Sequence, residues 1–127
     1  MTRTERTDIR VAVAGAPELV ETLRELVAAR GDIEVVAAGS SRAEAIALLH
    51  EKAPDICVVD RDLDGGGLIA AAALASPRQP KVIVVGADTP AEQRAVRLAG
   101  ATASIPHDDV RTELGALVVE LARKEQS

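Results

Sequence analysis

Short apolar runs alternate along this chain with segments that have helical periodicity. Residues 56–59 are almost entirely apolar, which predicts a strand that is covered on both faces. Within residues 18–30, Leu19, Leu23 and Leu26 recur every three or four positions, which predicts a helix with one buried face. By the same criteria, strands are predicted at residues 9–14, 33–38, 56–59, 81–85 and 102–105.

Capping signals place the starts of two helices. Ser41 and Glu44 have the spacing of a capping box, and so do Thr89 and Glu92, with Pro90 at the first helical position. Helices are predicted at residues 18–30, between Ser41 and Pro54, at 68–75, between Thr89 and Gly100, and at 109–124.

The predicted elements form a strand–helix unit that occurs five times. Strands covered on both faces are typical of parallel sheets, so we expect an α/β fold with a doubly wound, five-stranded parallel sheet. One domain over residues 9–124 accounts for the pattern. Residues 1–8 are expected to be a polar tail, and residues 125–127 a tail or the start of a linker.

Composition excludes several classes of function. The chain has no Phe, Tyr or Trp, and its net charge is −5, which argues against direct nucleic-acid binding. A single cysteine, Cys57, excludes an internal disulfide and is expected to be a buried hydrophobic residue. No apolar run is long enough to span a membrane, and residues 1–8 lack the apolar core of a signal peptide, so a cytoplasmic protein is expected.

Groups capable of chemistry concentrate after the third predicted strand. Asp60, Asp62 and Asp64 alternate there and run into a triple glycine at 65–67. Ligands of open parallel sheets bind beyond the carboxyl ends of the strands, where this loop is expected to lie. Three carboxylates in one loop repel each other unless a cation balances them.

The sequence around Asp60 resembles the receiver domains of two-component response regulators. Residues 54–60, Pro-Asp-Ile-Cys-Val-Val-Asp, look like the third strand of that family, and residues 9–13, 32–36 and 98–102 fit as well. The resemblance covers about residues 9–124 and is closest to receivers that precede a helix-turn-helix output domain. It implies the flavodoxin-like strand order 2-1-3-4-5, and it makes Asp60 the counterpart of the phosphoryl-accepting aspartate.

Other positions depart from the family. Where the family has an acidic pair that binds Mg²⁺, this chain has Gly15 and Ala16. Gly86 replaces the Thr or Ser that contacts the phosphoryl group, and Ser104 replaces the aromatic switch residue. Phosphoryl transfer is catalysed mainly by positioning and charge neutralisation, so these losses should slow phosphorylation by many orders of magnitude.

Two alignments with the family are possible around the position of its lysine. An ungapped alignment places His107 there, whereas aligning the family's proline with Pro106 places Ile105 there. Neither residue supplies the fixed cation that pairs with an acyl phosphate. The loop after the acceptor also differs, because the family's proline is replaced around Asp64.

The sequence therefore predicts a non-enzymatic, atypical pseudo-receiver that works through protein–protein contacts without Mg²⁺-dependent phosphorylation, and that needs no cofactor. One alternative is a genuine phosphoacceptor at Asp60, modified by a histidine kinase, with Asp62 and Asp64 replacing the lost Mg²⁺ ligands. A second alternative is a small-ligand sensor in the same pocket, with space opened by Gly15 and Gly86.

The expected partner is a protein or a second copy of the chain. On the first and last predicted helices, Val20, Ala116 and Val119 lie off the main inward stripe, and an apolar patch of these residues would suit a homodimer. The resemblance also implies a DNA-binding output domain outside this chain. No direct contact with nucleic acid or membrane is expected.

Overall fold

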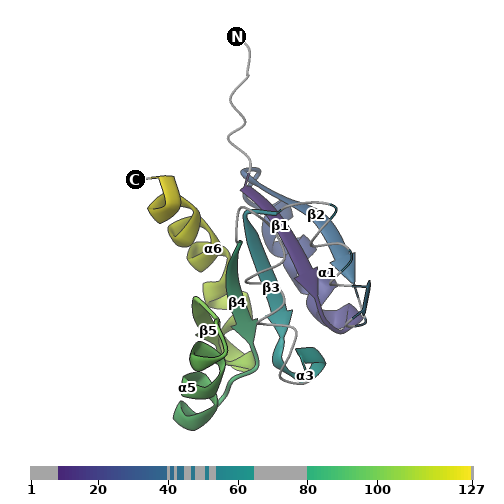
Figure 1. Ribbon diagram of the computed structural model, residues 1–127. Helices are drawn as coiled ribbons and strands as arrows, with labels where there is room; N and C mark the ends of the chain where they lie inside the picture. Colours follow the sequence, from purple (N-terminus) through teal and green to yellow (C-terminus); the bar gives the residue numbers. More distant parts are fainter. Residues whose placement is uncertain are drawn as a thin grey trace.

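Five strands lie side by side in one parallel sheet, in the order β2-β1-β3-β4-β5 (Figure 1). The computed structural model describes residues 9–39, 41, 43–44, 47, 51, 54–64 and 80–126. The strands are β1 (Ile9–Ala14), β2 (Ile33–Gly39), β3 (Ile56–Asp60), β4 (Lys81–Val85) and β5 (Ala103–Ile105). Both the parallel sheet and its order agree with the prediction.

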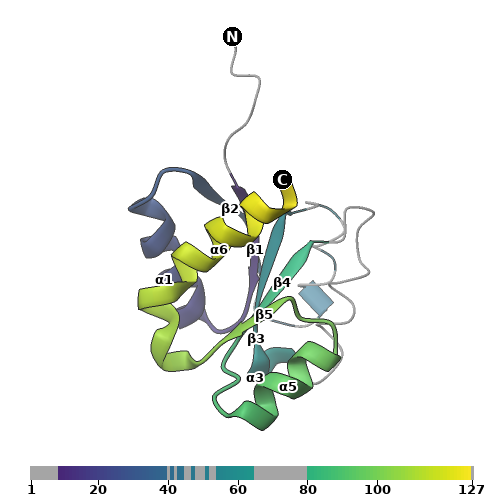
Figure 2. The same ribbon diagram turned by 90° about the vertical axis from the view of Figure 1, so that its left-hand side faces the viewer.

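Helices cover both faces of the sheet. They are α1 (Pro17–Ala28), α3 (Arg61–Asp64), α5 (Pro90–Leu98) and α6 (Val110–Gln126), with a 3-10 turn η1 (His107–Asp109) that leads into α6. Figure 2 shows α1 and α6 crossing the same face of the sheet, and the two helices contact each other. The side chain of Val96 on α5 packs into the core of the opposite face.

Successive strand residues divide between two cores. In β3, Ile56 and Val58 face the core under α1 and α6, whereas Cys57 and Val59 face the core that includes α5. None of these four residues is more than 1 % exposed, which explains why the strand is an unbroken apolar run. Burial raises the pKa of the Cys57 thiol to about 12, so Cys57 is the inert hydrophobic residue that was predicted.

The structure corrects several predicted boundaries, among them the end of the first helix, where α1 stops at Ala28 and not at residue 30. Residues 60–67 were expected to form a loop, but a helical turn, α3, begins directly after Asp60. The Asp60 carboxylate accepts a hydrogen bond from the Asp62 backbone N–H, which satisfies a donor of that first turn. At the other end of the chain, α6 continues to Gln126, past the predicted end at residue 124.

Several predicted features lie outside the described residues. They are the tail at 1–8, the glycines at 65–67, the helix at 68–75 and most of the helix after Ser41. The start of that last helix is described, and the Glu44 backbone N–H donates to Ser41 Oγ at 3.2 Å, as half of a capping box requires. Within the described part of the chain, no helix is both long and apolar enough to cross a membrane.

The proposed patch of Val20, Ala116 and Val119 is not the exposed surface that the sequence suggested. Val119 is only 6 % exposed and belongs to the core under α1 and α6. Val20 is half-buried and packs against the same core, so only Ala116 is exposed. Because α6 packs on both the sheet and α1, it buries a wider arc than a helix with one neighbour.

Candidate functional site

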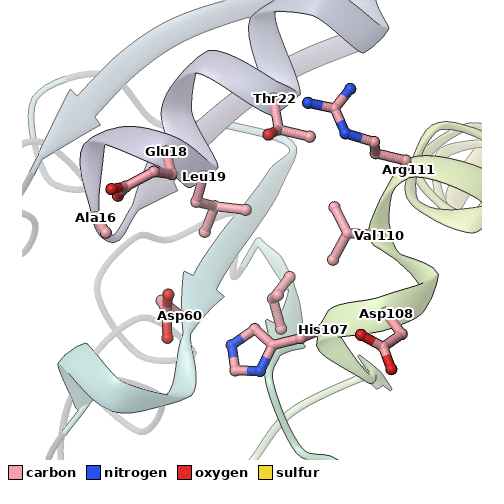
Figure 3. Close-up of a pocket in the computed structure, with 10 residues that line it drawn as sticks. Ala16, Glu18, Leu19, Thr22, Asp60, His107, Asp108, Val110 and Arg111 are labelled. Atoms are coloured by element: carbon pink, nitrogen blue, oxygen red, sulfur yellow. The ribbon is translucent and has the colours of Figure 1, made fainter.

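The carboxyl ends of β1, β3, β4 and β5 meet at one edge of the sheet, where a pocket of about 390 Å³ opens. Ten residues from both halves of the chain line it: Ala16, Glu18, Leu19, Thr22, Asp60, Val85, His107, Asp108, Val110 and Arg111. Figure 3 shows Asp60 and His107 at one end of this pocket, and Thr22 and Arg111 at the other. This is the sheet edge at which ligands of open parallel sheets bind.

Asp60 is held at the last position of β3 and is half-buried. Its Oδ1 accepts the backbone N–H of Asp62 at 2.9 Å, which fixes the carboxylate against α3. Asp62 is exposed on that helical turn. The side chain of Asp64 lies outside the described part of the chain, so its predicted place in the pocket stays a prediction.

Gly15 is packed too tightly to carry a side chain. A Cβ at this position would stand 2.8 Å from Leu19 Cδ2 and 2.9 Å from Asp60 Cβ. Real Cβ atoms do not approach other atoms so closely, so the surroundings of Gly15 would have to move to admit an acidic residue. Ala16, the other member of the lost acidic pair, is exposed and lines the pocket.

His107 occupies the space that a side chain at Gly86 would fill. Gly86 has φ of +105°, a backbone conformation that glycine adopts readily, and a Cβ there would lie 2.8 Å from His107 Cε1 and Nε2. His107 therefore faces the pocket, while Ile105 is 1 % exposed and part of the core. Of the two alignments at the lysine position, only the one with His107 puts a polar side chain beside Asp60.

Asp88 orients His107, a role that the sequence did not reveal. Its Oδ1 accepts the His107 backbone N–H at 2.9 Å, and its Oδ2 lies 3.2 Å from His107 Nδ1. These two hydrogen bonds, the backbone one first, hold the pKa of Asp88 below its ordinary value of 3.8. The residues are 19 positions apart, so the only available signal was that both loops follow strands that end at the same edge.

Two arginines near the pocket, both in the described part of the chain, are engaged with carboxylates. Arg61 lies 3.6 Å from Glu92, and Arg111 lies 3.1 Å from Glu25. All four side chains are at least about a third exposed, so solvent screens both pairs. Arg61 directly follows Asp60 in the chain, but its partner in the structure is Glu92.

Comparisons with solved structures identify the architecture. The receiver domain of NarL from Mycobacterium tuberculosis has a TM-score of 0.79 and 24 % identity, over 91 % of this chain and 97 % of that one. A LuxR-family two-component response regulator from Aurantimonas has a TM-score of 0.78 and 25 % identity, over 92 % of this chain and 86 % of that one.

The response regulator RcsB from Salmonella typhimurium, in a structure concerned with DNA interaction, has a TM-score of 0.81 and 18 % identity. The match covers 91 % of this chain and 62 % of RcsB. No family model matches the sequence, and no curated protein matches it. The structural likenesses therefore establish the receiver fold, as the resemblance implied.

Proposed function

We propose that this receiver-fold chain is an atypical signalling receiver that acts through protein–protein contacts, without Mg²⁺-dependent phosphorylation. The observation that carries the proposal is the packing around Asp60. The structural neighbours are receivers of response regulators, which supports a signalling role rather than an enzymatic one. The side chains around Asp60 distinguish this chain from a phosphorylated receiver.

Three features argue against phosphoryl transfer to Asp60. Gly15 has no space for a Mg²⁺-binding carboxylate, and Gly86 offers no hydroxyl to the phosphoryl oxygens. His107 stands where the family's lysine is expected, and its Nδ1 is engaged with Asp88. Mg²⁺ requires near-octahedral oxygen ligation, and the transition state of phosphoryl transfer requires fixed positive charge. The residues that usually meet these two requirements are absent from this pocket.

The test is an amide NMR spectrum of the chain, recorded with and without Mg²⁺ and beryllofluoride, a phosphoryl mimic. We expect no saturable shift at Asp60, Gly15 or Gly86. A saturable shift at these amides that is absent from an Asp60→Asn variant would overturn the proposal. It would identify Asp60 as a working phosphoacceptor and direct the search to a histidine kinase.

The pocket favours a second candidate, the binding of a small molecule as a sensor. Its volume of about 390 Å³ is near the lower end of ordinary ligand sites, and its wall combines apolar Leu19, Val85 and Val110 with charged Arg111. Ligands that raise the melting temperature of the chain, but not of a Val85→Leu variant with a filled pocket, would support this candidate. A small-molecule panel without such a ligand would leave protein contacts as the preferred function.

The partners that we propose follow from the kinds of protein found among the structural neighbours. RcsB and the LuxR-family regulator are response regulators, and the RcsB structure concerns DNA interaction. We therefore include a DNA-binding output domain, together with a second copy of the chain, among the protein partners. The net charge of −5 and the lack of aromatic residues do not suit direct contact of this chain with DNA.

A further inference from the structure

Three side chains at the pocket edge lie close enough to one another to hold a metal ion. Asp60, Asp62 and His107 each offer one ligand atom, and these atoms all lie within 4.8 Å of one another. They come from the end of β3, from α3 and from η1, so the fold itself brings them together. Two carboxylates and an imidazole form a mixed donor set, which differs from the all-oxygen set that Mg²⁺ prefers.

A separate feature prepares His107 to bind a cation. Its Nδ1 is hydrogen-bonded to Asp88, which lies outside the three-residue cluster, at 3.2 Å. In the tautomer with a proton on Nδ1, the lone pair of Nε2 is available, and Figure 3 shows the Nε2 edge of the ring turned toward Asp60. A carboxylate that holds the second ring nitrogen is the usual companion of a metal-bound histidine, because it fixes the ring and increases its basicity.

The absence of side chains at Gly15 and Gly86 leaves space for this arrangement. A Cβ at Gly86 would lie 2.8 Å from His107 Nε2, so any larger residue there would displace the ring. A Cβ at Gly15 would lie 3.7 Å from Asp60 Oδ2, which is the carboxylate oxygen not used by the Asp62 backbone N–H. Gly15 stands at one position of the family's Mg²⁺-binding pair, and Gly86 stands where the family contacts the phosphoryl group. The two glycines thus leave room for a site of different composition.

We propose that Asp60, Asp62 and His107 bind a divalent transition-metal ion, with Zn²⁺ as the representative, in preference to Mg²⁺. Asp88 is the positioning residue that holds the imidazole. Imidazole nitrogen suits borderline ions such as Zn²⁺, whereas Mg²⁺ takes oxygen ligands in strict octahedral geometry. Three protein ligands leave at least one coordination position for water or for a donor from a partner. This inference goes beyond the proposed function and does not depend on it.

The sequence contains few other nitrogen or sulfur donors for such an ion, with one cysteine and one further histidine. Cys57 is 1 % exposed, and its pKa is raised to about 12, so no thiolate is accessible to Zn²⁺. The chain has two histidines, and His50 is the other one. A His50→Ala variant therefore serves as the matched control for His107→Ala. Glu113 is exposed on α6 and belongs neither to the cluster nor to the pocket lining, so Glu113→Gln is the control for Asp88→Asn.

The experiment is isothermal titration calorimetry of the full chain with Zn²⁺ alone and with Mg²⁺ alone, after treatment with a chelator. We expect one Zn²⁺ per chain, bound more tightly than Mg²⁺. Asp88→Asn should weaken Zn²⁺ binding about 10–100-fold, as the loss of an orienting partner does. His107→Ala and Asp62→Asn should weaken it at least as much, while His50→Ala and Glu113→Gln leave it unchanged.

Each contrary result would overturn the proposal. These results are an absence of Zn²⁺ binding, a Zn²⁺ affinity unchanged by His107→Ala, a Mg²⁺ affinity equal to that for Zn²⁺, or a loss in the Glu113→Gln control equal to that in Asp88→Asn. Asp62→Asn keeps the test decisive if His107→Ala fails to fold, because Asp62 is exposed on α3. A failure of Zn²⁺ binding would leave the beryllofluoride test unaffected, so the two proposals fail separately.

Discussion

The absence of a side chain at Gly86 makes room for the imidazole ring of His107. Gly86 follows β4 with φ of +105°, and its backbone N–H donates to the Ile105 carbonyl at 2.8 Å. Residues other than glycine are strained at such a φ, whatever space surrounds them. Gly86 therefore carries both a backbone requirement and a steric one.

Substitution at Gly86 should cost more stability than substitution at a glycine that has only the backbone requirement. Gly31 also has a positive φ, +81°, but a Cβ there would meet nothing within 4 Å. We expect Gly31→Ala to lower the free energy of unfolding by about 1–2 kcal/mol through strain. Gly86→Ala should add about 1–3 kcal/mol for the clash with His107. Chemical denaturation measures both, and equal losses would show that His107 moves aside freely.

Asp88 should make the stability of the chain depend on acid pH. Its pKa is lower in the folded chain than its ordinary 3.8, so folding favours the ionised form. The resulting stabilisation is fully present above the unfolded-state pKa of about 3.9 and is lost as the pH falls below it. We expect Asp88→Asn to melt below wild type at pH 7, and the gap to close towards pH 3. Melting curves in a chelator test this, and a gap constant across this range would contradict it.

At the scale of elements, α5 has the most complete N-terminal cap among the described helices. Thr89 Oγ1 accepts the Glu92 backbone N–H at 3.2 Å, and Glu92 Oε1 accepts the Thr89 backbone N–H at the same distance. Pro90 follows at the first helical position. Glu92 also accepts the Asp88 backbone N–H, so the cap of α5 is joined to the loop that orients His107.

Loss of this cap should weaken α5 and the loop before it. We expect Thr89→Ala to lower the free energy of unfolding by about 1 kcal/mol, because an orphan N–H loses its acceptor. Glu92→Gln is the matched control, since glutamine also completes a capping box. Denaturant unfolding of the two variants provides the comparison. A Glu92→Gln loss as large as that of Thr89→Ala would show that charge, rather than capping, is what matters here.

At the scale of the whole molecule, the two helices on one face decide which surface is free for partners. α1 and α6 share a core, and Arg111 on α6 lies 3.1 Å from Glu25 on α1. Both of these side chains are more than 60 % exposed, so their ion pair contributes little stability. The core beneath them holds the helices together, and Val119 is part of it.

A truncation at Val119 should therefore reduce stability rather than association. We expect Val119→Ala to cost about 1–3 kcal/mol through lost burial and a small cavity. The exposed neighbour provides the control, because Ala116→Ser should change stability by less than about 0.5 kcal/mol. Denaturation, with light scattering to report the oligomeric state, distinguishes the roles. A Val119→Ala variant of unchanged stability but altered association would restore this residue as an interface.

The local pattern determined the five strands of this protein and the helices α1, α5 and α6. The predicted strand at 81–85 matches β4 residue for residue, and the other strands differ by at most one residue at an end. Unbroken apolar runs also indicated a parallel sheet, because both faces of such strands must be covered. These features depend on neighbours along the chain, which is why the sequence contains them. The strand order came from the family resemblance, and the structure has the same order.

The tertiary structure decided which residues meet and how deeply they are buried. Periodicity indicated the buried side of α6, but not the width of the buried arc, which α1 extends to Val119. Asp60 was found from its place after β3, whereas the contact of His107 with Asp88 depends on loops that meet only when the sheet forms. Gly15 and Gly86 were recognised as replacements, but only the packed structure shows that neighbouring side chains occupy their Cβ positions. Such contacts join distant parts of the chain, so no local pattern encodes them.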